Sequence, residues 1–475
     1  MLFSSTTFLF VFLPIVLAVY FITPRKLKNL VLLIASLIFY AWGEPKYILV
    51  MLATILVNYV LAIVCENCQK TGKIKGAKAA VTGSIVFSIG MLAFFKYSNF
   101  FLDNYNHTIG AVSGTKLPLL EIALPLGISF YTFQTLSYTI DVYRKEVKAQ
   151  RNPLHLATYV CLFPQLIAGP IVRYQTVAEE LEDRKESVPE FADGVRRFVI
   201  GFGKKVLLAN TAGSVFDLVG NMPDAQVTVG LYWLSAIAFT FQIYFDFSGY
   251  SDMAIGLGKI FGFDFLENFN YPYISGSVRE FWRRWHISLS SWFRDYLYIP
   301  LGGSRKGAWR TYRNLFIVFF VTGLWHGASY NFILWGLFHG VFLVLERWKL
   351  GAFLERIPQV FRHIYTLLIV MIAWVFFRAE TLPEAGQYLL QMVNVTHCNW
   401  NAVYTNINPE QVTFMILGIL FSLPVVDRFT ERFVENGRRK QVWNSLYLAV
   451  VGGGFILSIC YMTGSGFNPF IYFRF

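Results

Sequence analysis

The sequence is poor in charged residues, which make up 15% of it, whereas soluble domains carry about 25%. Hydrophobic residues make up 55% and aromatic residues 18%. This balance excludes an ordinary soluble protein. By length alone, 475 residues would suggest about three soluble domains. Hydrophobic segments recur from end to end without a long soluble stretch, so we predict one polytopic body embedded in a membrane.

Cysteines and the common catalytic motifs are also scarce. The five cysteines are scattered, and Cys65 and Cys68 lack the second pair that a zinc site needs, so we interpret them as packing residues. The sequence contains no G-x-S-x-G, H-E-x-x-H or P-loop motif. Serine hydrolase, zinc protease and ATPase functions are therefore unsupported, and we predict no metal and no bound cofactor.

Long apolar runs are present instead. A membrane-spanning helix needs about 20 mostly apolar residues. Such runs lie near residues 6–22, 29–43, 47–65, 78–96, 118–140, 195–217, 229–250, 361–378, 411–427 and 443–462, and residues 313–348 hold two shorter ones. The first run lacks a basic n-region and an A-x-A cleavage site, so we expect a span and not a removed signal. The pattern predicts an all-α protein with about 11–12 transmembrane helices.

The formal net charge of +12 lies in short loops between these runs, which favours membrane orientation over nucleic-acid binding. Lysine and arginine cluster in residues 24–28, 66–78, 144–151, 303–313 and 438–440. Neither residue occurs in 97–115, 218–228 or 379–410. The positive-inside rule then places the basic loops in the cytoplasm and both chain ends outside.

Two segments fit poorly as simple spans. Residues 154–175 are interrupted by Pro164 and by Gly169-Pro170, and residues 278–300 carry several charges and a histidine. Irregular backbone at membrane depth is tolerated only where protein surrounds it, so we expect re-entrant or tilted elements in both. The charged residues 178–197 predict one cytoplasmic amphipathic helix.

His326 lies in the segment FVTGLWHGASYN (320–331), 13 residues after Arg313. Counted from Arg313 and from Glu346 at about 1.5 Å rise per residue, it would lie roughly 20 to 30 Å from the inner face of a core about 30 Å thick. An ionisable side chain at that depth indicates a functional site, and neighbours such as Gly327 can open the helix; a core histidine satisfied by packing is the alternative. His339 would face the opposite side of a continuous helix, so we expect a structural role.

The segment 283–295 contains His286. At helical spacing Phe281, Trp285, Leu289, Trp292 and Tyr296 would form one aromatic stripe, with His286, Ser290 and Arg294 on another line. The alternative is an interfacial helix with snorkelling arginines. Asp246 and Asp252 are equally compatible with a structural polar network and with a site.

Two of these segments resemble the signature sequences of the membrane-bound O-acyltransferase (MBOAT) family: RRWHISLSSWFRDYLYIPLGG (283–303) and GLWHG (323–327). Four more resemble bacterial alginate O-acetyltransferase membrane subunits, a branch related to D-alanyl transferases: 39–47, 124–144, 163–170 and 244–258. The resemblance implies one MBOAT domain with a central tunnel. Its parts would be N-terminal spans (1–145), a core with re-entrant segments and both histidines (146–350), and C-terminal spans with an aromatic tail (351–475).

The resemblance also implies that His286 and His326 face the tunnel. Relatives move an acyl group, usually acetyl, from a cytosolic thioester to a hydroxyl on the other side. We assign His326 as general base, because imidazole titrates near neutral pH. His286 would bind the thioester carbonyl or orient the donor, and Arg283 and Arg284 would meet its phosphates or else lipid headgroups. Rings more than about 12 Å apart, roughly one Debye length, would contradict a shared passage.

The chain ends in FNPFIYFRF (467–475), which resembles an F-x-Y-F-x-F ending found in some relatives and in a small partner of the D-alanyl system. By that match Tyr472 is a candidate acyl relay, a covalent role that splits the transfer into two steps. Its phenol, with a pKa of about 10, would need a base. The alternative is an interfacial aromatic belt with Arg474 at the headgroups.

We therefore predict a multi-pass O-acyltransferase of the bacterial cytoplasmic membrane that acts in O-acetylation of cell-surface polysaccharide or cell wall. The donor would be acetyl-CoA or an acyl carrier protein thioester. The expected partners are an extracytoplasmic acetyltransferase protein, membrane lipids and the polymer acceptor, with no nucleic acid. Alternatives are D-alanyl transfer to teichoic acid from a carrier protein, a transporter or flippase with an intramembrane proton relay, and a scaffold without catalysis.

Overall fold

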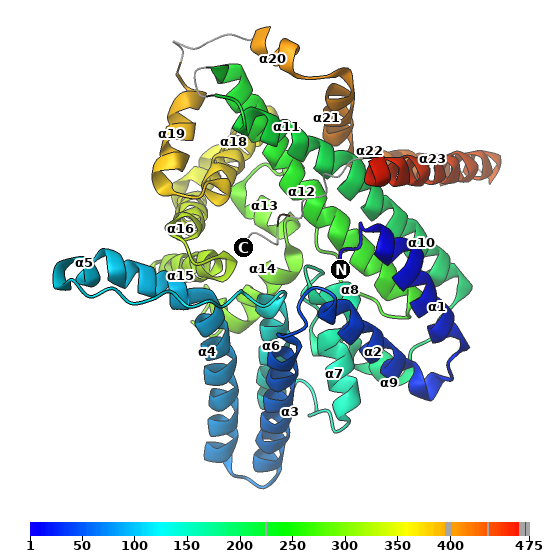
Figure 1. Cartoon of the computed structure of the whole chain (residues 1–475), viewed down its shortest axis with the longest axis vertical. Helices are drawn as coiled ribbons and strands as arrows, with labels where there is room; N and C mark the ends of the chain where they lie inside the picture. The colour runs from blue at the N-terminus through cyan, green and yellow to red at the C-terminus, as the bar shows by residue number, and fades with distance from the viewer. Residues whose placement is uncertain (224–225, 395–400, 435–436, 465–470, 472–475) are drawn as a thin grey trace. The chain divides into compact units, whose positions relative to one another are not determined.

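The structure of the full chain is a computed structural model that describes residues 1–223, 226–394, 401–434, 437–464 and 471 (Figure 1). Within these ranges every regular element is helical, and no strand occurs. The predicted all-α polytopic fold is confirmed.

The chain forms two compact units. Unit 1 comprises Met1–Val195 and Ala254–Leu266, and unit 2 comprises Arg196–Met253 and Glu267–Phe475. Two helices, α10 (Val188–Gly203) and α12 (Val229–Ile260), contain residues of both units. His286 and His326 both belong to unit 2. The single MBOAT domain expected from the resemblance stays a prediction.

Unit 1 consists of short helices around three long ones. Its elements are η1 (Phe8–Phe12), α1 (Leu13–Ile22), η2 (Arg25–Leu27), α2 (Lys28–Ala41), α3 (Ile48–Lys70), α4 (Ile74–His107), α5 (Ile109–Ser113), α6 (Ile128–Arg144), α7 (Pro153–Cys161), α8 (Phe163–Leu166) and α9 (Tyr174–Asp183). Helices α3, α4 and α6 pack side by side (Figure 1). Asn58 of α3 joins them, since its amide donates to Ser88 (3.1 Å) and accepts from Ser84 (2.5 Å) and Thr139 (3.3 Å). Such interhelical hydrogen bonds stabilise helix packing where water is excluded.

The predicted amphipathic helix over 178–197 is wrong, because the chain breaks between α9 and α10. The break turns two charged side chains inward. Arg184 donates from Nε to the Tyr20 hydroxyl at 2.8 Å, and Glu186 accepts from that hydroxyl at 2.6 Å and from Lys28 Nζ at 2.8 Å. A continuous helix could not aim both side chains at the same tyrosine.

Unit 2 contains the remaining elements. They are η3 (Lys204–Ala209), α11 (Asn210–Gly220), η5 (Pro272–Ile274), α13 (Val278–Arg284), α14 (Ile287–Phe293), η6 (Arg294–Tyr298), α15 (Ala308–His326), α16 (Tyr330–Leu345), η7 (Glu346–Leu350), α17 (Gly351–Leu354), α18 (Gln359–Arg378), α19 (Leu382–Met392), α20 (Asn401–Asn406), α21 (Pro409–Phe421), α22 (Val425–Val434) and α23 (Gly437–Gly464). Helices α15 and α16 form a tight hairpin. A Cβ at Gly336 would overlap the Phe319 carbonyl oxygen, and one at Gly323 would overlap that of Phe332, so these glycines set the close approach.

Four helices of the described chain are long and apolar enough to cross a membrane: α3, α4, α18 and residues 441–464 of α23. A fifth span results if α21 and the start of α22, which meet at 55°, are counted together. The sequence predicted 11–12 spans. The count differs partly because some apolar runs are interrupted or form helices shorter than a full span. The run at 118–140 becomes helical only from Ile128, after Gly127 at φ 73°, and α2 in the run at 29–43 has only 14 residues.

The interruption predicted within 154–175 is observed. Helix α7 ends at Cys161, the short α8 follows, and no helix forms again before Tyr174. Residues 158–172 are nevertheless buried throughout. Irregular backbone here is surrounded by protein, which is the condition under which it is tolerated at membrane depth.

Candidate active site

His286 lies at a break between two short helices. The N-terminus of α13 is held by two acceptors: the Ser277 hydroxyl accepts from the Glu280 N–H (3.0 Å), and Glu346 accepts from the Val278 N–H (2.7 Å). After α13 ends, His286 adopts the left-handed conformation (φ 45°, ψ 55°), and α14 starts at the next residue. The aromatic stripe predicted on one continuous helix is therefore wrong, because the break changes the rotational phase of every later side chain. A non-glycine residue in this conformation is strained and often belongs to a functional site.

Asn268 fixes the orientation of the His286 ring. Its side-chain oxygen lies 3.1 Å from Nδ1 of His286 and also accepts from the backbone N–H (3.2 Å) and the hydroxyl (2.9 Å) of Ser288. Its amide group donates to the Ser251 hydroxyl at 2.9 Å. Because a backbone N–H can only donate, this set assigns the Asn268 oxygen as an acceptor and His286 Nδ1 as a donor. The neutral ring then carries its lone pair on Nε2, which is buried and has no hydrogen-bond partner in the described protein.

His326 is the last residue of α15. Gly327 follows in an extended conformation (φ −170°, ψ 160°), and a Cβ there would overlap the Phe332 ring. The helix therefore opens at the position where the sequence placed a glycine. Aromatic rings surround the imidazole, with centroids at 4.9 Å for Trp335 and 5.3 Å for Phe377.

The Trp325 ring lies close to both histidines. Its ring centroid is 6.3 Å from that of His286 and 5.0 Å from that of His326. Added together, these distances give an upper limit of about 11.3 Å for the separation of the two imidazole centroids. The rings are therefore closer than the 12 Å that would have contradicted a shared passage.

A count along one continuous helix predicted that His339 would face away from His326. In the structure it lies in the same ring cluster. The break after His326 invalidates that count. The His339 ring centroid is 5.2 Å from Trp335 and 5.1 Å from Trp282. Both ring nitrogens of His339 and the indole nitrogens of Trp282 and Trp335 are buried without a hydrogen-bond partner in the described protein. Since buried polar groups are normally paired, these nitrogens are unused donors and acceptors within the ring cluster.

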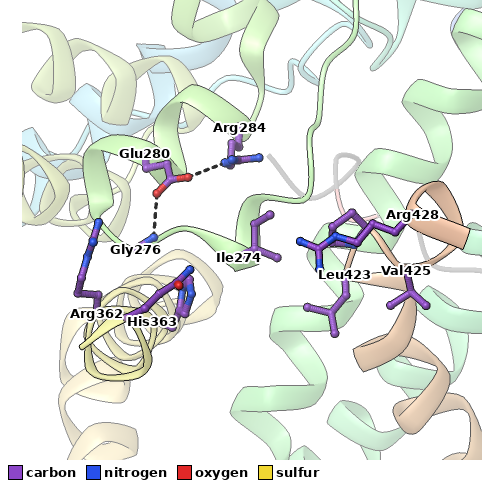
Figure 2. A pocket seen from close by; sticks show the side chains of 11 residues that line it. Ile274, Gly276, Glu280, Arg284, Arg362, His363, Leu423, Val425 and Arg428 are labelled. Carbon is purple, nitrogen blue, oxygen red and sulfur yellow. Dashed lines mark hydrogen bonds and ion pairs between the residues drawn. The ribbon is translucent and has the colours of Figure 1, made fainter. Parts of the chain in front are cut away.

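A cavity of about 350 Å³, here called the arginine pocket, lies beside α13 (Figure 2). Its lining comes from three segments: Ile274, Gly276, Glu280 and Arg284; Gln359, Arg362 and His363; and Leu423, Pro424, Val425 and Arg428. Of the two predicted donor-binding residues, Arg284 lines this pocket. Arg283 is exposed and does not line it. Sequence reasoning missed Arg362 and Arg428, because nothing near either residue in the sequence connects it to α13.

A second cavity of about 450 Å³, here called the outer pocket after the side that the loop charges predict for it, contains residues of 218–228 and 379–410, the segments without lysine or arginine. Its lining includes the carboxylates of Asp217, Glu380 and Glu384, the guanidinium of Arg378 and the ring of Trp374. The Trp374 ring is 5.5 Å from Phe377, which is itself 5.3 Å from His326. Aromatic contacts therefore connect this pocket to the ring wall around His326.

Asp246 and Asp252 belong to two polar networks within unit 2. Asp252 pairs with Arg197 (2.8 Å) and Lys204 (2.7 Å), and Asp246 pairs with the buried Lys205 (2.6 Å). The other Asp246 oxygen accepts from the backbone N–H of Ile471 at 2.9 Å. These contacts fit the first of the two alternatives for Asp246 and Asp252, a structural polar network. Tyr472, the candidate relay, lies outside the described residues.

Comparison with known proteins identifies the family. The family model for membrane-bound O-acyltransferases matches residues 143–379, which include both histidines. The chain is 40% identical to the "Probable alginate O-acetylase AlgI" of Pseudomonas putida over the full length of both proteins. The chain belongs to the membrane-bound O-acyltransferase family. The resemblance noted in the sequence is confirmed, and the protein is an acyltransferase.

Two further relatives place this acyltransferase within the family. It is 45% identical to the protein of the same name from Pseudomonas aeruginosa, over 81% of this chain and 73% of the relative. It is 35% identical to a peptidoglycan O-acetyltransferase of Helicobacter pylori, over 83% of this chain and 80% of the relative. The relatives thus include O-acetylating enzymes named for two different polymers.

Proposed function

We propose that this acyltransferase takes an acetyl group from a cytosolic thioester, passes it through unit 2, and delivers it to a hydroxyl on the opposite side of the membrane. The product would be O-acetylated cell-surface polysaccharide or cell wall. The names of the Pseudomonas and Helicobacter relatives support this choice of group and acceptor. The proximity of both imidazoles to the same ring, that of Trp325, is the observation that carries it.

The chemical step requires mainly a general base placed next to the acceptor hydroxyl. An acceptor hydroxyl attacks the thioester carbonyl, the C–S bond breaks as the new C–O bond forms, and the hydroxyl proton leaves with the thiol. His326 serves as the general base that removes this proton. His286 orients the donor. Its Nε2 accepts a hydrogen bond when the ring is neutral and donates one to the thioester carbonyl only when the ring is protonated.

The two pockets supply a direction for the transfer. The arginine pocket contains residues at the start of α18, and the outer pocket contains residues at its end. Loop charges assign the start of α18 to the cytoplasm and the lysine- and arginine-free segment after it to the outside. An anionic donor would therefore enter beside α13, and the acceptor would approach from the outer pocket.

The outward step would use a relay or a partner. Tyr472 accepts the acetyl group as a phenyl ester and passes it to an extracytoplasmic acetyltransferase, which acetylates the polymer. This arrangement requires a multi-pass protein in the bacterial cytoplasmic membrane, with acetyl-CoA or a carrier-protein thioester on the inner side. The hydrogen bond from Ile471 to Asp246 supports the relay, because it holds the residue before Tyr472 inside unit 2.

Transfer of labelled acetyl by the purified full-length protein in lipid nanodiscs tests the proposal. His326→Ala should lower the rate by at least 100-fold, the lower range of a general-base contribution. The exposed His107→Ala is the matched control and should keep the wild-type rate. If His326→Ala and His286→Ala both transfer acetyl at the wild-type rate, the proposal is wrong. Movement of a glycan across the membrane without acetyl transfer would indicate a transporter.

A further inference from the structure

Among the described residues, the non-glycine residues with a left-handed backbone are Lys145, Tyr271 and His286, and the last two belong to unit 2. We propose that Tyr271 is a positioning residue for His286, and that the hydrogen bond from its hydroxyl to Asp427 of α22 holds the His286 ring in the state that acetyl transfer requires. This inference rests on the proposed function, because it names a residue that supports the histidine of that reaction.

A short backbone pairing encloses His286. The Asn270 N–H donates to the Arg284 carbonyl at 2.9 Å, before His286 in the chain. The Ile287 N–H donates to the Asn268 carbonyl at 2.9 Å, directly after it. The two paired segments run in opposite directions, and the left-handed residue lies between the two bonds. A shift of the segment that contains Asn268 and Asn270 would therefore move the backbone of His286.

Side chains of the same residues extend this pairing. The Asn268 side-chain oxygen lies 3.1 Å from Nδ1 of His286, and Arg284 donates from Nη1 to the Asn270 carbonyl at 3.1 Å. The segment 268–270 therefore sets both the backbone and the ring of His286.

Tyr271 follows this segment in a conformation that is costly for its residue type. Its φ is 45° and its ψ is 60°, values that are rare for a bulky side chain. A residue before a proline normally has an extended backbone, and Pro272 follows Tyr271. Such a conformation persists only where surrounding contacts hold it. A contact of the Tyr271 side chain can therefore decide where the segment before it lies.

The Tyr271 side chain makes such a contact with α22. Its hydroxyl donates to Asp427 Oδ2 at 2.8 Å, across 156 residues of sequence. Hydrogen bonds to a carboxylate are stronger than those between neutral groups. Asp427 lies in the first turn of α22, where the helix dipole favours a negative charge. The bond ties the end of segment 268–270 to a separate helix.

Acetyl transfer by the full-length protein in lipid nanodiscs, with acetyl-CoA as donor, tests the inference. Tyr271→Phe removes only the hydroxyl and should lower kcat roughly 3- to 10-fold, the effect of one hydrogen bond. KM for acetyl-CoA should change less than about 2-fold, because the change acts on the state of His286 and not on donor binding.

Tyr59→Phe is the matched control. Tyr59 is half-buried like Tyr271, and its hydroxyl also donates to a distant segment, at the Arg151 carbonyl (2.6 Å), but in unit 1. This variant should keep the wild-type kcat and KM.

Asp427 provides a second route in case Tyr271→Phe fails to fold, because Asp427 is exposed on α22. Asp427→Ala should lower kcat as Tyr271→Phe does. Asp427→Asn keeps an oxygen that accepts from the tyrosine and should retain more of the rate than Asp427→Ala. The double variant Tyr271→Phe/Asp427→Ala should be no slower than either single variant, because both remove the same bond. Losses that multiply in the double variant would overturn the inference.

The state of the His286 ring supplies a readout that a purely structural role would not change. Nitrogen NMR of protein with isotope-labelled histidine distinguishes a ring protonated at Nδ1 from one protonated at Nε2. The His286 signal is the one, among seven histidines, that His286→Gln removes. Wild type and Tyr59→Phe should show the Nδ1–H form, and Tyr271→Phe and Asp427→Ala should show a mixture of both forms. An unchanged His286 signal in the folded variants would overturn the inference.

The two measurements separate this inference from the proposed function. If the wild-type protein transfers acetyl and Tyr271→Phe does so with the same kcat, the positioning role falls and the proposed function stands. If the His286 signal depends on Tyr271 but the wild-type protein transfers no acetyl, the proposed function falls and the positioning of His286 stands.

Discussion

The side-chain oxygen of Asn268 lies 3.1 Å from Nδ1 of His286, and the backbone N–H of Ser288 donates to the same oxygen. The two contacts leave a single neutral tautomer for His286, with Nε2 free to accept a proton. Asn268 thus acts as a positioning residue, one that sets the state of the histidine without touching substrate. A fixed tautomer matters in catalysis because only the correct nitrogen can meet the reacting group.

Replacement of Asn268 tests this role. Asn268→Ala should lower kcat by roughly 10- to 100-fold with little change in KM for the donor, comparable to loss of an orienting partner of a histidine. Asn268→Asp should restore part of the rate and move the acidic limb of the pH–rate profile to higher pH, because a carboxylate favours the imidazolium. Ser291→Ala, which removes a hydroxyl that donates to the Ser288 carbonyl, should be silent. A pH profile identical in wild type and Asn268→Asp would exclude the role.

Breaking the buried pair of Lys205 and Asp246 should destabilise unit 2. Their side chains are 3% and 2% exposed and lie 2.6 Å apart. Asp246→Asn removes a carboxylate from this buried ammonium and should cost about 3–5 kcal/mol of unfolding free energy. Thermal unfolding in detergent measures this change. Asp183→Asn, at a pair more than 60% exposed on both sides, is the control and should cost less than about 1 kcal/mol. Equal melting temperatures for the two variants would contradict the prediction.

Glu180 should make stability depend on pH near neutrality. Burial, with the nearby Asp264 charge, raises the pKa of Glu180 to about 7, against about 4.3 in an unfolded chain. A raised pKa means that the folded state holds the proton more tightly, so stability falls as pH rises from about 4.3 through 7. Glu180→Gln should remove this decline, and Glu179→Gln, at its exposed neighbour, should keep it. Melting temperatures of wild type and Glu180→Gln at pH 5.5 and 8 test this. An equal change in melting temperature between the two pH values for both proteins would refute the prediction.

Two glycines one turn apart on α16 provide a matched test of helix packing. A Cβ at Gly336 would overlap the Phe319 carbonyl oxygen, whereas one at Gly340 would meet the Phe319 side chain at 3.4 Å, an ordinary contact. Gly336→Ala should therefore force α15 and α16 apart and cost about 1–3 kcal/mol. Gly340→Ala should be neutral or slightly stabilising, since alanine favours helix. Equal yields of folded protein for both variants would show that the hairpin is less tight than described.

Tyr472 is tested by removal of its hydroxyl. If it relays the acetyl group, Tyr472→Phe should abolish delivery to an external acceptor, since the phenol supplies the oxygen of the covalent intermediate. Intact-mass analysis should then find one acetyl group, an added mass of about 42 Da, on the wild type but not on the variant. Arg474→Gln, two residues further along the chain, serves as the nearby control and should keep transfer. Full transfer by Tyr472→Phe would end the relay hypothesis.

The sequence was sufficient for the class of protein. It also singled out His286 and His326, whose roles stay predictions. Apolar runs and scarce charge predict membrane helices, because a helix forms its own backbone hydrogen bonds where no water is available. Gly327 after His326 indicated where α15 would open. The same local patterns failed where a helix broke, as at His286 and between Asp183 and Val188, since a break alters the phase of every residue that follows.

Tertiary structure alone decided which distant residues meet. Asn268 reaches His286 across 18 residues, and the arginine pocket joins Arg284 to Arg362 and Arg428. The packing of separate helices also brings Trp325 close to both histidines and Gly276 against the Arg362 guanidinium. Local periodicity cannot specify such contacts, because it fixes which face a side chain occupies on its own helix but not which other helix lies against that face.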